Sequence, residues 1–270
     1  MNFFDILSFD FAKRALIAGV LICLCAALLG VNLVLKRFSM LGDGLSHISF
    51  GTAAIAAAAG VSPLKIAIPV VIIAAILLLR INEKGKIRGD AATAIVSSSA
   101  LAIGIIVATL TTGMNTDINN YMFGSILALG KSDVYISVIA ATLIIVLYVL
   151  FYEKIFVCSF DEKFALATGV NVGFYNGLNA VLTAVITVIG MRITGALLIS
   201  SIITFPALSS MRVCKKYNST VILSAIISVA AFIAGLSLSF LFDMPAGASV
   251  VVVNLIIFIA MTLIGKVKIK

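Results

Sequence analysis

The sequence has little charge, a single histidine and no tryptophan, and these shortages already exclude most kinds of soluble protein. Only 11% of its 270 residues are charged and 62% are hydrophobic, whereas soluble domains carry about 25% charged residues. A water-soluble globule could not hide so much apolar surface. The mean hydropathy of +1.24 and the long unbroken apolar runs indicate membrane-spanning helices. They exclude a transmembrane β-barrel, whose strands alternate weakly over about ten residues.

Several catalytic and nucleotide-binding patterns are also missing. The chain has no Gly-x-x-x-x-Gly-Lys-Ser/Thr loop for ATP, no His-Glu-x-x-His pair for a metalloprotease and no Gly-x-Ser-x-Gly elbow for a hydrolase. We therefore expect a non-catalytic membrane protein without a permanently bound cofactor. The formal net charge of +8 does not indicate a nucleic-acid-binding protein, because the basic residues lie in short loops between apolar runs.

The four cysteines predict no disulfide framework. Cys23 and Cys25 lie two positions apart in the first apolar run, so they point in different directions on a helix. Cys158 and Cys214 lie in basic loops that we place in the cytoplasm, where thiols stay reduced. All four cysteines are expected to serve packing.

Nine apolar stretches predict an all-α polytopic membrane protein, a bundle of eight to nine transmembrane helices in a single domain over residues 1–270. The expected spans are 15–35, 40–61, 64–80, 91–111, 134–152, 173–190, 194–211, 220–242 and 248–265. The loop at 112–133 is expected to form a short helix at the outer surface. The loop at 153–172 is expected to form a short helix along the inner surface.

The basic residues orient these spans in the membrane. When successive loops are assigned alternately to the two sides, 14 of the 19 lysines and arginines fall on the side of 153–172 and of the C-terminus. The positive-inside rule then places the C-terminus in the cytoplasm and the N-terminus outside the cell membrane.

The second span carries the residues with metal-binding chemistry. Asp43 and His47 are four residues apart, so their side chains share one face of a helix. His47 lies eleven residues beyond Lys36 at the inner surface, or about 16 Å along a helix. Half of a hydrocarbon core of about 30 Å is similar, so the pair is expected near the middle of the membrane, with Ser46 one step round the helix.

An ionised carboxylate at that depth costs at least about 2.5–3.5 kcal/mol unless a base, water or a metal ion compensates. Carboxylate and imidazole suit zinc, manganese or ferrous iron. One helix offers two ligands, and a two-fold dimer with this helix on its axis offers four. The small-residue run at 51–60 indicates close helix packing that would let the pair approach its symmetry mate. We therefore predict a transient metal site. The alternative is a purely structural pair, with Asp43 bonded to His47 or capping the helix.

The remaining polar residues of the spans are expected to hydrogen-bond between helices, and Asn32, Asn179 and Asn254 are the main examples. Acidic residues of the outer loops, such as Asp133, are expected to be solvated, or to collect cations at an entrance.

Five segments of the chain resemble the permease subunits of zinc/manganese/iron-type metal ABC importers, and the resemblance covers nearly the whole length. The segments are Ser39-Met40-Leu41-Gly42-Asp43-Gly44-Leu45-Ser46-His47, Tyr121-Met122-Phe123-Gly124-Ser125-Ile126-Leu127, Phe160-Asp161-Glu162-Lys163-Phe164-Ala165 with Gly169, Gly195-Ala196-Leu197-Leu198-Ile199-Ser200-Ser201 with Pro206-Ala207, and Met244-Pro245-Ala246-Gly247-Ala248. The first is similar to the family's Gly-Asp-x-x-Ser-His signature.

This resemblance implies a homodimeric type II ABC importer permease. Two copies would associate with two cytoplasmic ATPase subunits and receive metal from an extracytoplasmic solute-binding protein. Asp43 and His47 would be the pathway ligands. The segment 160–170 would dock on the ATPase, with coupling residues Asp161, Glu162, Ala165 and Gly169. The cargo is expected to be zinc, then manganese or iron.

Two other classes of function stay open on the sequence. A secondary metal/proton exchanger would use Asp43 and His47 as a proton relay, although the loop at 153–172 has no purpose in such a protein. An intramembrane enzyme or a structural scaffold is the third class, and the absence of a nucleophile with its base argues against an enzyme.

Overall fold

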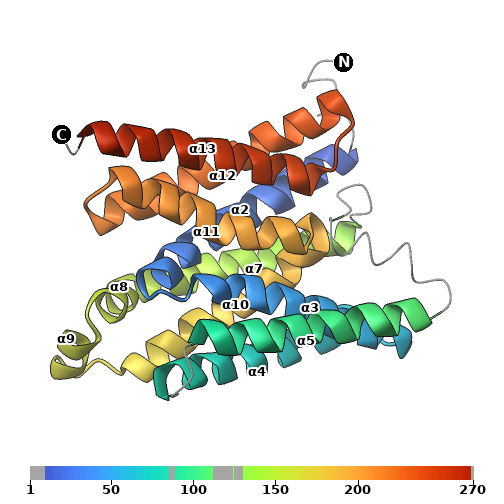
Figure 1. Ribbon diagram of the computed structural model, residues 1–270, viewed down its shortest axis with the longest axis horizontal. Coiled ribbons are helices and arrows are strands. Elements are labelled where there is room, and N and C mark those ends of the chain that lie inside the picture. Colours follow the sequence, from blue (N-terminus) through green and yellow to red (C-terminus); the bar gives the residue numbers. More distant parts are fainter. Residues whose placement is uncertain (1–9, 85–88, 112–123, 125–129, 269–270) are drawn as a thin grey trace.

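The computed structural model describes residues 10–84, 89–111, 124 and 130–268, and within these ranges every regular element is a helix. In chain order the helices are α2 (Asp10–Leu35), α3 (Ser39–Ala58), α4 (Pro63–Lys84), α5 (Gly89–Leu110), α7 (Lys131–Leu150), α8 (Tyr152–Phe160), α9 (Glu162–Ala167), α10 (Val172–Thr194), α11 (Ala196–Val213), α12 (Tyr217–Phe242) and α13 (Ala246–Lys268). The long helices run side by side along one direction, and α8 and α9 lie together at one end (Figure 1).

Each of the nine expected spans lies on one long helix of the described chain, with boundaries that differ by at most five residues. The helices extend past the apolar runs because polar residues continue the helical turn, as Arg80 and Lys84 do in α4. Eight of these helices are long and apolar enough to cross a membrane. The ninth, α3, is more polar because it contains glycines, serines, Asp43 and His47. The predicted all-α bundle of eight to nine transmembrane helices is confirmed.

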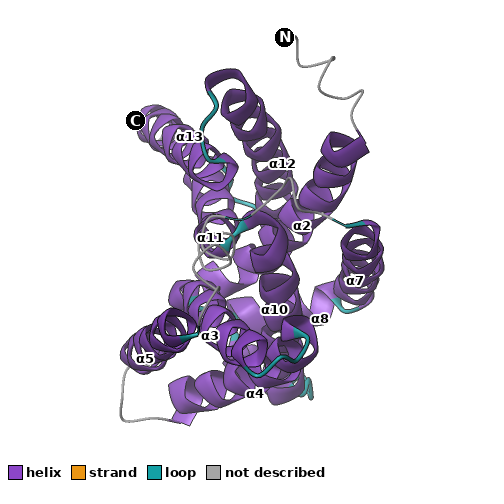
Figure 2. Cartoon of the chain, turned by 90° about the vertical axis from the view of Figure 1, so that its right-hand side faces the viewer, coloured by secondary structure: helices purple, strands orange, loops and turns teal. Residues whose placement is uncertain are grey.

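Helix α2 forms the centre of the bundle. It packs against α7, α10, α11 and α12, and Figure 2 shows it between α7 and α12. Its residues Ala18, Ile22, Ala26 and Leu29 are completely buried. Their spacing of four, four and three places them on one face of the helix, so this face belongs to the core of the protein and not to the lipid.

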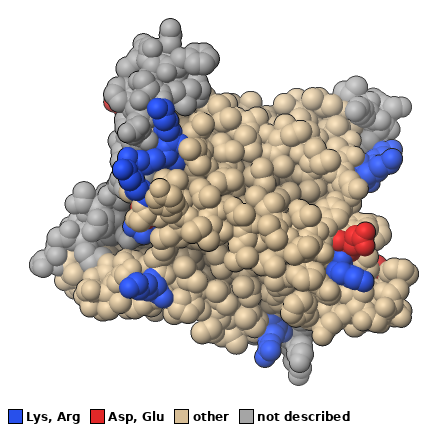
Figure 3. Space-filling model, turned by 180° about the vertical axis from the view of Figure 1, so that it is seen from behind, with Lys and Arg blue, Asp and Glu red and all other residues tan. Residues whose placement is uncertain are grey.

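The surface between the two ends of the bundle is poor in charge. Figure 3 shows lysines, arginines and acids toward the ends, with a broad uncharged area between them, as a chain embedded in a bilayer requires. Helix α2 begins at one end of the bundle and α13 finishes at the other (Figure 1), which agrees with nine crossings. Which end faces the cytoplasm stays a prediction.

The two long loops have different outcomes. Residues 112–123 and 125–129 lie outside the described residues. Most of the loop at 112–133, where a short helix was expected, and most of the motif at 121–127 fall on them. The single short helix expected at 153–172 was wrong, because the chain forms two helices, α8 and α9, that meet at Asp161. The four cysteines are free, as predicted, and three of them are buried.

Candidate functional site

Asp43 and His47 lie together near the middle of α3. His47 is the ninth of the twenty residues of this helix, so about 12 Å of helix precedes it and about 16 Å follows it. The carboxylate oxygen Oδ2 of Asp43 is 3.7 Å from Nε2 of His47. The side chains keep 43% and 24% of their surface exposed, respectively. The predicted pairing of the two groups on one face of a helix is therefore present, and the pair lies near the middle of that helix.

Asp43 does not cap the helix, and it forms no direct hydrogen bond with His47. Asp43 is the fifth residue of α3, which begins at Ser39, so it does not cap the helix. A separation of 3.7 Å is too long for a hydrogen bond between the side chains. The hydroxyl of Ser46 donates to the backbone oxygen of Asp43 at 2.7 Å and not to its carboxylate. The two side chains thus form no hydrogen bond with each other or with Ser46.

The neighbours of α3 show which way the pair faces. Just before Asp43, Gly42 packs against Ile203 of α11, and just after it Gly44 packs against Thr93 of α5. Successive residues are 100° apart on a helix, so the Asp43 side chain points outward between α11 and α5. Figure 2 shows α11 and α3 between α13 and α5 along one side of the bundle. The pair therefore lies on an open face and is not sealed inside the chain.

The spacing of the two side chains would suit two ligands of one metal ion. Two ligand atoms that bind one tetrahedral ion at about 2.1 Å are roughly 3.4 Å apart, close to the 3.7 Å between Asp43 and His47. Among the described residues, no group of three or more His, Cys, Asp or Glu side chains could hold a metal ion. One carboxylate and one imidazole are therefore all that this part of a single chain offers.

The small-residue run after the pair allows the close helix packing that we expected, and the helix it packs against is α5 of the same chain. A Cβ atom on Gly51 would lie 2.3 Å from the backbone oxygen of Ala100 in α5, and one on Gly104 would lie 2.6 Å from the Cα atom of Gly51. The close approach of α3 and α5 holds the helix that carries Asp43 and His47 in a fixed position.

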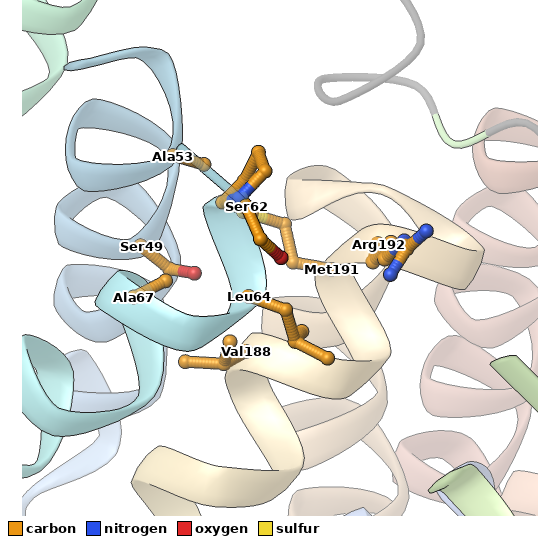
Figure 4. A pocket seen from close by; sticks show the side chains of 9 residues that line it. Ser49, Ala53, Ser62, Leu64, Ala67, Val188, Met191 and Arg192 are labelled. Atoms are coloured by element: carbon orange, nitrogen blue, oxygen red, sulfur yellow. The ribbon is translucent and has the colours of Figure 1, made fainter. Parts of the chain in front are cut away.

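A small cavity lies on the opposite side of α3. Its volume is about 80 Å³, and α3, the start of α4 and the C-terminal part of α10 line it. Figure 4 shows Ser49 at one side of it and Arg192 at the other. Ser49 follows His47 by two residues, or about 200° around the helix. This cavity therefore does not contain the Asp43–His47 pair.

The predicted coupling residues lie in α9 or beside it, and most of them stabilise the local structure of the segment. The carboxylate of Asp161 accepts hydrogen bonds from the backbone N–H groups of Lys163 at 2.9 Å and Phe164 at 3.0 Å, so it caps α9. Ala165 is completely buried. Gly169 follows α9 with a φ of 77°, a left-handed conformation that glycine adopts without strain.

Glu162 fastens α9 to the end of α2. Its Oε1 atom lies 2.7 Å from Nζ of Lys36, whose side chain is only 7% exposed. Asn176 of α10 donates to the same carboxylate at 3.2 Å and accepts from Lys36. Burial alone would raise the pKa of Glu162, but the hydrogen bond and charge of Lys36 and the amide of Asn176 outweigh it and hold the pKa below its ordinary value.

This ion pair makes the segment sensitive to acid. The unfolded carboxyl has a pKa of about 4.3. Because the folded value is lower, Glu162 stabilises the fold above that pH, and its contribution is lost as the pH falls through the folded value. We expect the thermal unfolding temperature to fall more steeply below about pH 4.3 in the parent chain than in Glu162→Gln. Glu153→Gln, at another exposed acid of the segment, is the control. Parallel curves for the parent and Glu162→Gln would contradict the assignment.

The sequence did not single out the side chains that α8 and α9 expose. Phe160, Phe164 and Leu166 are all more than half exposed. The helices that carry them, α8 and α9, lie at one end of the bundle (Figure 1). Their apolar character was visible in the sequence. Their exposure was not, because it depends on Ala165 turning inward. Together we call these three residues the end patch.

Two other polar predictions have clear outcomes. Asn32 forms interhelical hydrogen bonds as expected, since it accepts from Tyr217 at 2.7 Å and donates to Tyr148 at 3.3 Å. Asp133 was expected to be solvated, but it is buried. It lies 3.0 Å from Arg192 and accepts from the backbone of Gly130, so its charge is already neutralised and it cannot collect cations.

Comparison with known proteins gives a consistent result over nearly the whole chain. Residues 8–265 match the model of the ABC 3 transport family. The manganese transport system membrane protein MntC of Listeria monocytogenes is 30% identical over 253 residues, which cover 94% of this chain and 90% of that protein. The high-affinity zinc uptake system membrane protein ZnuB of Haemophilus influenzae is 27% identical over 251 residues, which cover 93% and 96%.

A solved structure agrees with these relatives. A chain of PsaBC from Streptococcus pneumoniae in complex with Fab matches with a TM-score of 0.86 and 31% identity, over 96% of this chain and 94% of that one.

Proposed function

The chain belongs to the ABC 3 transport family, and on that premise we propose that it carries a divalent transition-metal ion through the cell membrane by means of Asp43 and His47. It is the permease subunit of a metal ABC importer and itself hydrolyses no ATP. The observation that carries the proposal is the position of a carboxylate oxygen 3.7 Å from an imidazole nitrogen on an open face near the middle of α3.

We propose further that a second copy of the chain covers this face. A carboxylate facing lipid would cost at least about 2.5–3.5 kcal/mol, and Asp43 is 43% exposed in the single chain. Two copies related by a two-fold axis would remove this exposure and bring four ligands to one ion. Two ligands from each copy would hold the ion weakly enough for it to move on, as conduction requires.

The donor set accommodates more than one metal. Imidazole and carboxylate in a set of four ligands suit zinc, which prefers tetrahedral sites. Carboxylate oxygen also suits manganese, and relatives named for each of these metals match the chain. We propose zinc as the first cargo and manganese as the second.

The end patch is the proposed contact with a cytoplasmic ATPase. Exposed apolar side chains in a cluster mark protein interaction sites, and Asp161, Glu162, Ala165 and Gly169 hold Phe160, Phe164 and Leu166 in place. This end would then face the cytoplasm, in agreement with the excess of basic residues on its side. An extracytoplasmic solute-binding protein would deliver metal to the other end.

The proposal is tested by uptake of zinc or manganese into proteoliposomes that contain the chain with its ATPase and solute-binding protein. We expect uptake to require ATP, and zinc to be taken up at lower concentrations than manganese. Phe164→Asp should abolish ATP-driven uptake and release the ATPase, because it places a charge within an apolar contact. Uptake by the chain without ATPase, driven by a proton gradient, would instead identify an exchanger.

Phe242→Asp is the matched control for the end patch. Phe242 is a similarly exposed phenylalanine that ends α12 at the opposite end of the bundle, so the ATPase should remain bound to this variant. Release of the ATPase by both variants would show a general effect of exposed charge and would contradict the assigned surface.

A further inference from the structure

A second feature of the membrane-embedded surface is a groove on the side of the bundle away from Asp43 and His47. It has a volume of about 610 Å³ and lies between α2, α12 and the junction of α7 with α8. Figure 2 shows α7 and α12 on either side of α2, across the bundle from α5. A second copy placed over the Asp43–His47 face would therefore leave this groove open to lipid.

The floor and the rim of the groove differ in chemistry. Leu28, Val221 and Ile222 give it apolar walls toward the membrane interior. Tyr152, Lys154 and Asn218 line it at the α8–α9 end, where the long helices finish. The groove is apolar along its length and ends in polar and cationic groups at the membrane boundary. A phospholipid matches this arrangement, because its apolar acyl chains end in a polar headgroup.

The rim is positively charged overall. Lys154 is exposed, and Glu153 beside it carries the opposite charge. Lys215 and Lys216, both exposed, immediately precede α12 and its groove residue Asn218. Three lysines against one glutamate give this corner a net positive charge, and basic pockets between transmembrane helices attract anionic lipid headgroups.

The rim is also held in a fixed shape. The Tyr152 hydroxyl donates to Asn218 across the groove at 2.6 Å, and the rings of Tyr152 and Tyr217 have centroids 5.4 Å apart. Tyr217 in turn bonds Tyr148 and Asn32. Tyrosines are typical of the boundary between membrane and water. The hydrogen bond between α8 and α12 keeps the two sides of the groove together at the level of the headgroups.

We propose that this groove binds one anionic phospholipid, with an acyl chain along Leu28, Val221 and Ile222 and the phosphate beside Lys154. The ligand is a lipid and not a free phosphate, because the apolar walls contribute contact area that only an acyl chain would use. The bound lipid joins α2, α8 and α12 at the end of the bundle that carries the end patch. The inference goes beyond metal transport and does not depend on it.

The test uses the full chain purified in mild detergent and dioleoyl phosphatidylglycerol, with dioleoyl phosphatidylcholine as the neutral lipid. Native mass spectrometry counts the lipids retained per chain. We expect one phosphatidylglycerol to be retained in preference to phosphatidylcholine. Lys154→Gln should weaken its binding about fivefold, the effect of one lysine at a membrane surface. Ile222→Trp should abolish binding by filling the groove. Glycerol phosphate, which lacks acyl chains, should not displace the lipid.

Two control variants separate the groove from general effects. Lys266→Gln removes an exposed lysine near the same end on α13, and Ile226→Trp enlarges an exposed residue of α12 one turn beyond the groove. Both should retain phosphatidylglycerol as the parent does. Equal loss with Lys154→Gln and Lys266→Gln, equal retention of the two lipids, or full binding by Ile222→Trp would overturn the proposal.

Discussion

Replacing either Asp43 or His47 with alanine is expected to lower metal uptake at least about 100-fold, while the chain still folds and assembles. Loss of a group that only orients a metal ligand costs 10–100-fold, and these side chains are the proposed ligands themselves. In a symmetric pair each substitution removes two of four donors. Both residues lie on an open face, so their removal leaves no cavity in the core of the chain.

The measurement is ATP-driven uptake of zinc and manganese, together with the metal content of the purified protein. Asp43→Asn and His47→Gln keep the size of the side chains and should show nearly the same loss. Thr52→Ala is the control on α3, because the hydroxyl of Thr52 is already bonded to the backbone of Ile48 at 2.8 Å. Full uptake by the Asp43 and His47 variants would refute the ligand assignment.

Adding one methyl group at Gly51 is expected to destabilise the chain by about 1–3 kcal/mol, the usual cost of overpacking. The new Cβ atom would lie 2.3 Å from the backbone oxygen of Ala100, which cannot rotate away as a side chain does. Helices α3 and α5 must therefore separate. Alanine otherwise stabilises a helix by about 1 kcal/mol relative to glycine. The expected loss of stability in Gly51→Ala is therefore opposite to the effect of helix propensity.

Thermal unfolding in detergent measures this effect, and a thiol-reactive dye can follow it because Cys23 and Cys25 are buried and free. Gly177→Ala in α10 is the matched control, since no atom lies within 4 Å of its added Cβ, and it should be unchanged or slightly more stable. Gly104→Ala should resemble Gly51→Ala. Similar shifts at Gly51 and Gly177 would contradict the close packing of α3 on α5.

The sequence alone was sufficient for the spans and for the metal-ligand candidates. Long apolar runs predict the spans without knowledge of the other helices, because each charged residue placed in lipid has its own free-energy cost. The spacing of Asp43 and His47 fixes them on one helical face whatever the neighbouring helices are. Interhelical bonding was predicted for Asn32, Asn179 and Asn254 alike. The structure shows it for Asn32, whereas the amide of Asn254 donates to Val250 of its own helix.

The sequence could not decide which face of a helix meets protein and which meets lipid. Leu143 of α7 is 57% exposed and Ile144 beside it is 1% exposed, yet both are equally apolar. In a soluble protein the exposed face would be polar, and periodicity would reveal it. In a bilayer both surroundings are apolar, so this signal disappears.

The sequence by itself predicted which segments span the membrane and that the carboxylate and the imidazole share one face of a helix. Only the tertiary structure decided that α3 and α5 touch at Gly51, that Glu162 meets Lys36 across 126 positions of the chain, and that Phe164 faces outward. The reason is that each of these contacts depends on which helices are neighbours. Neighbours are selected by the shapes of packed side chains, which no local pattern of polarity records.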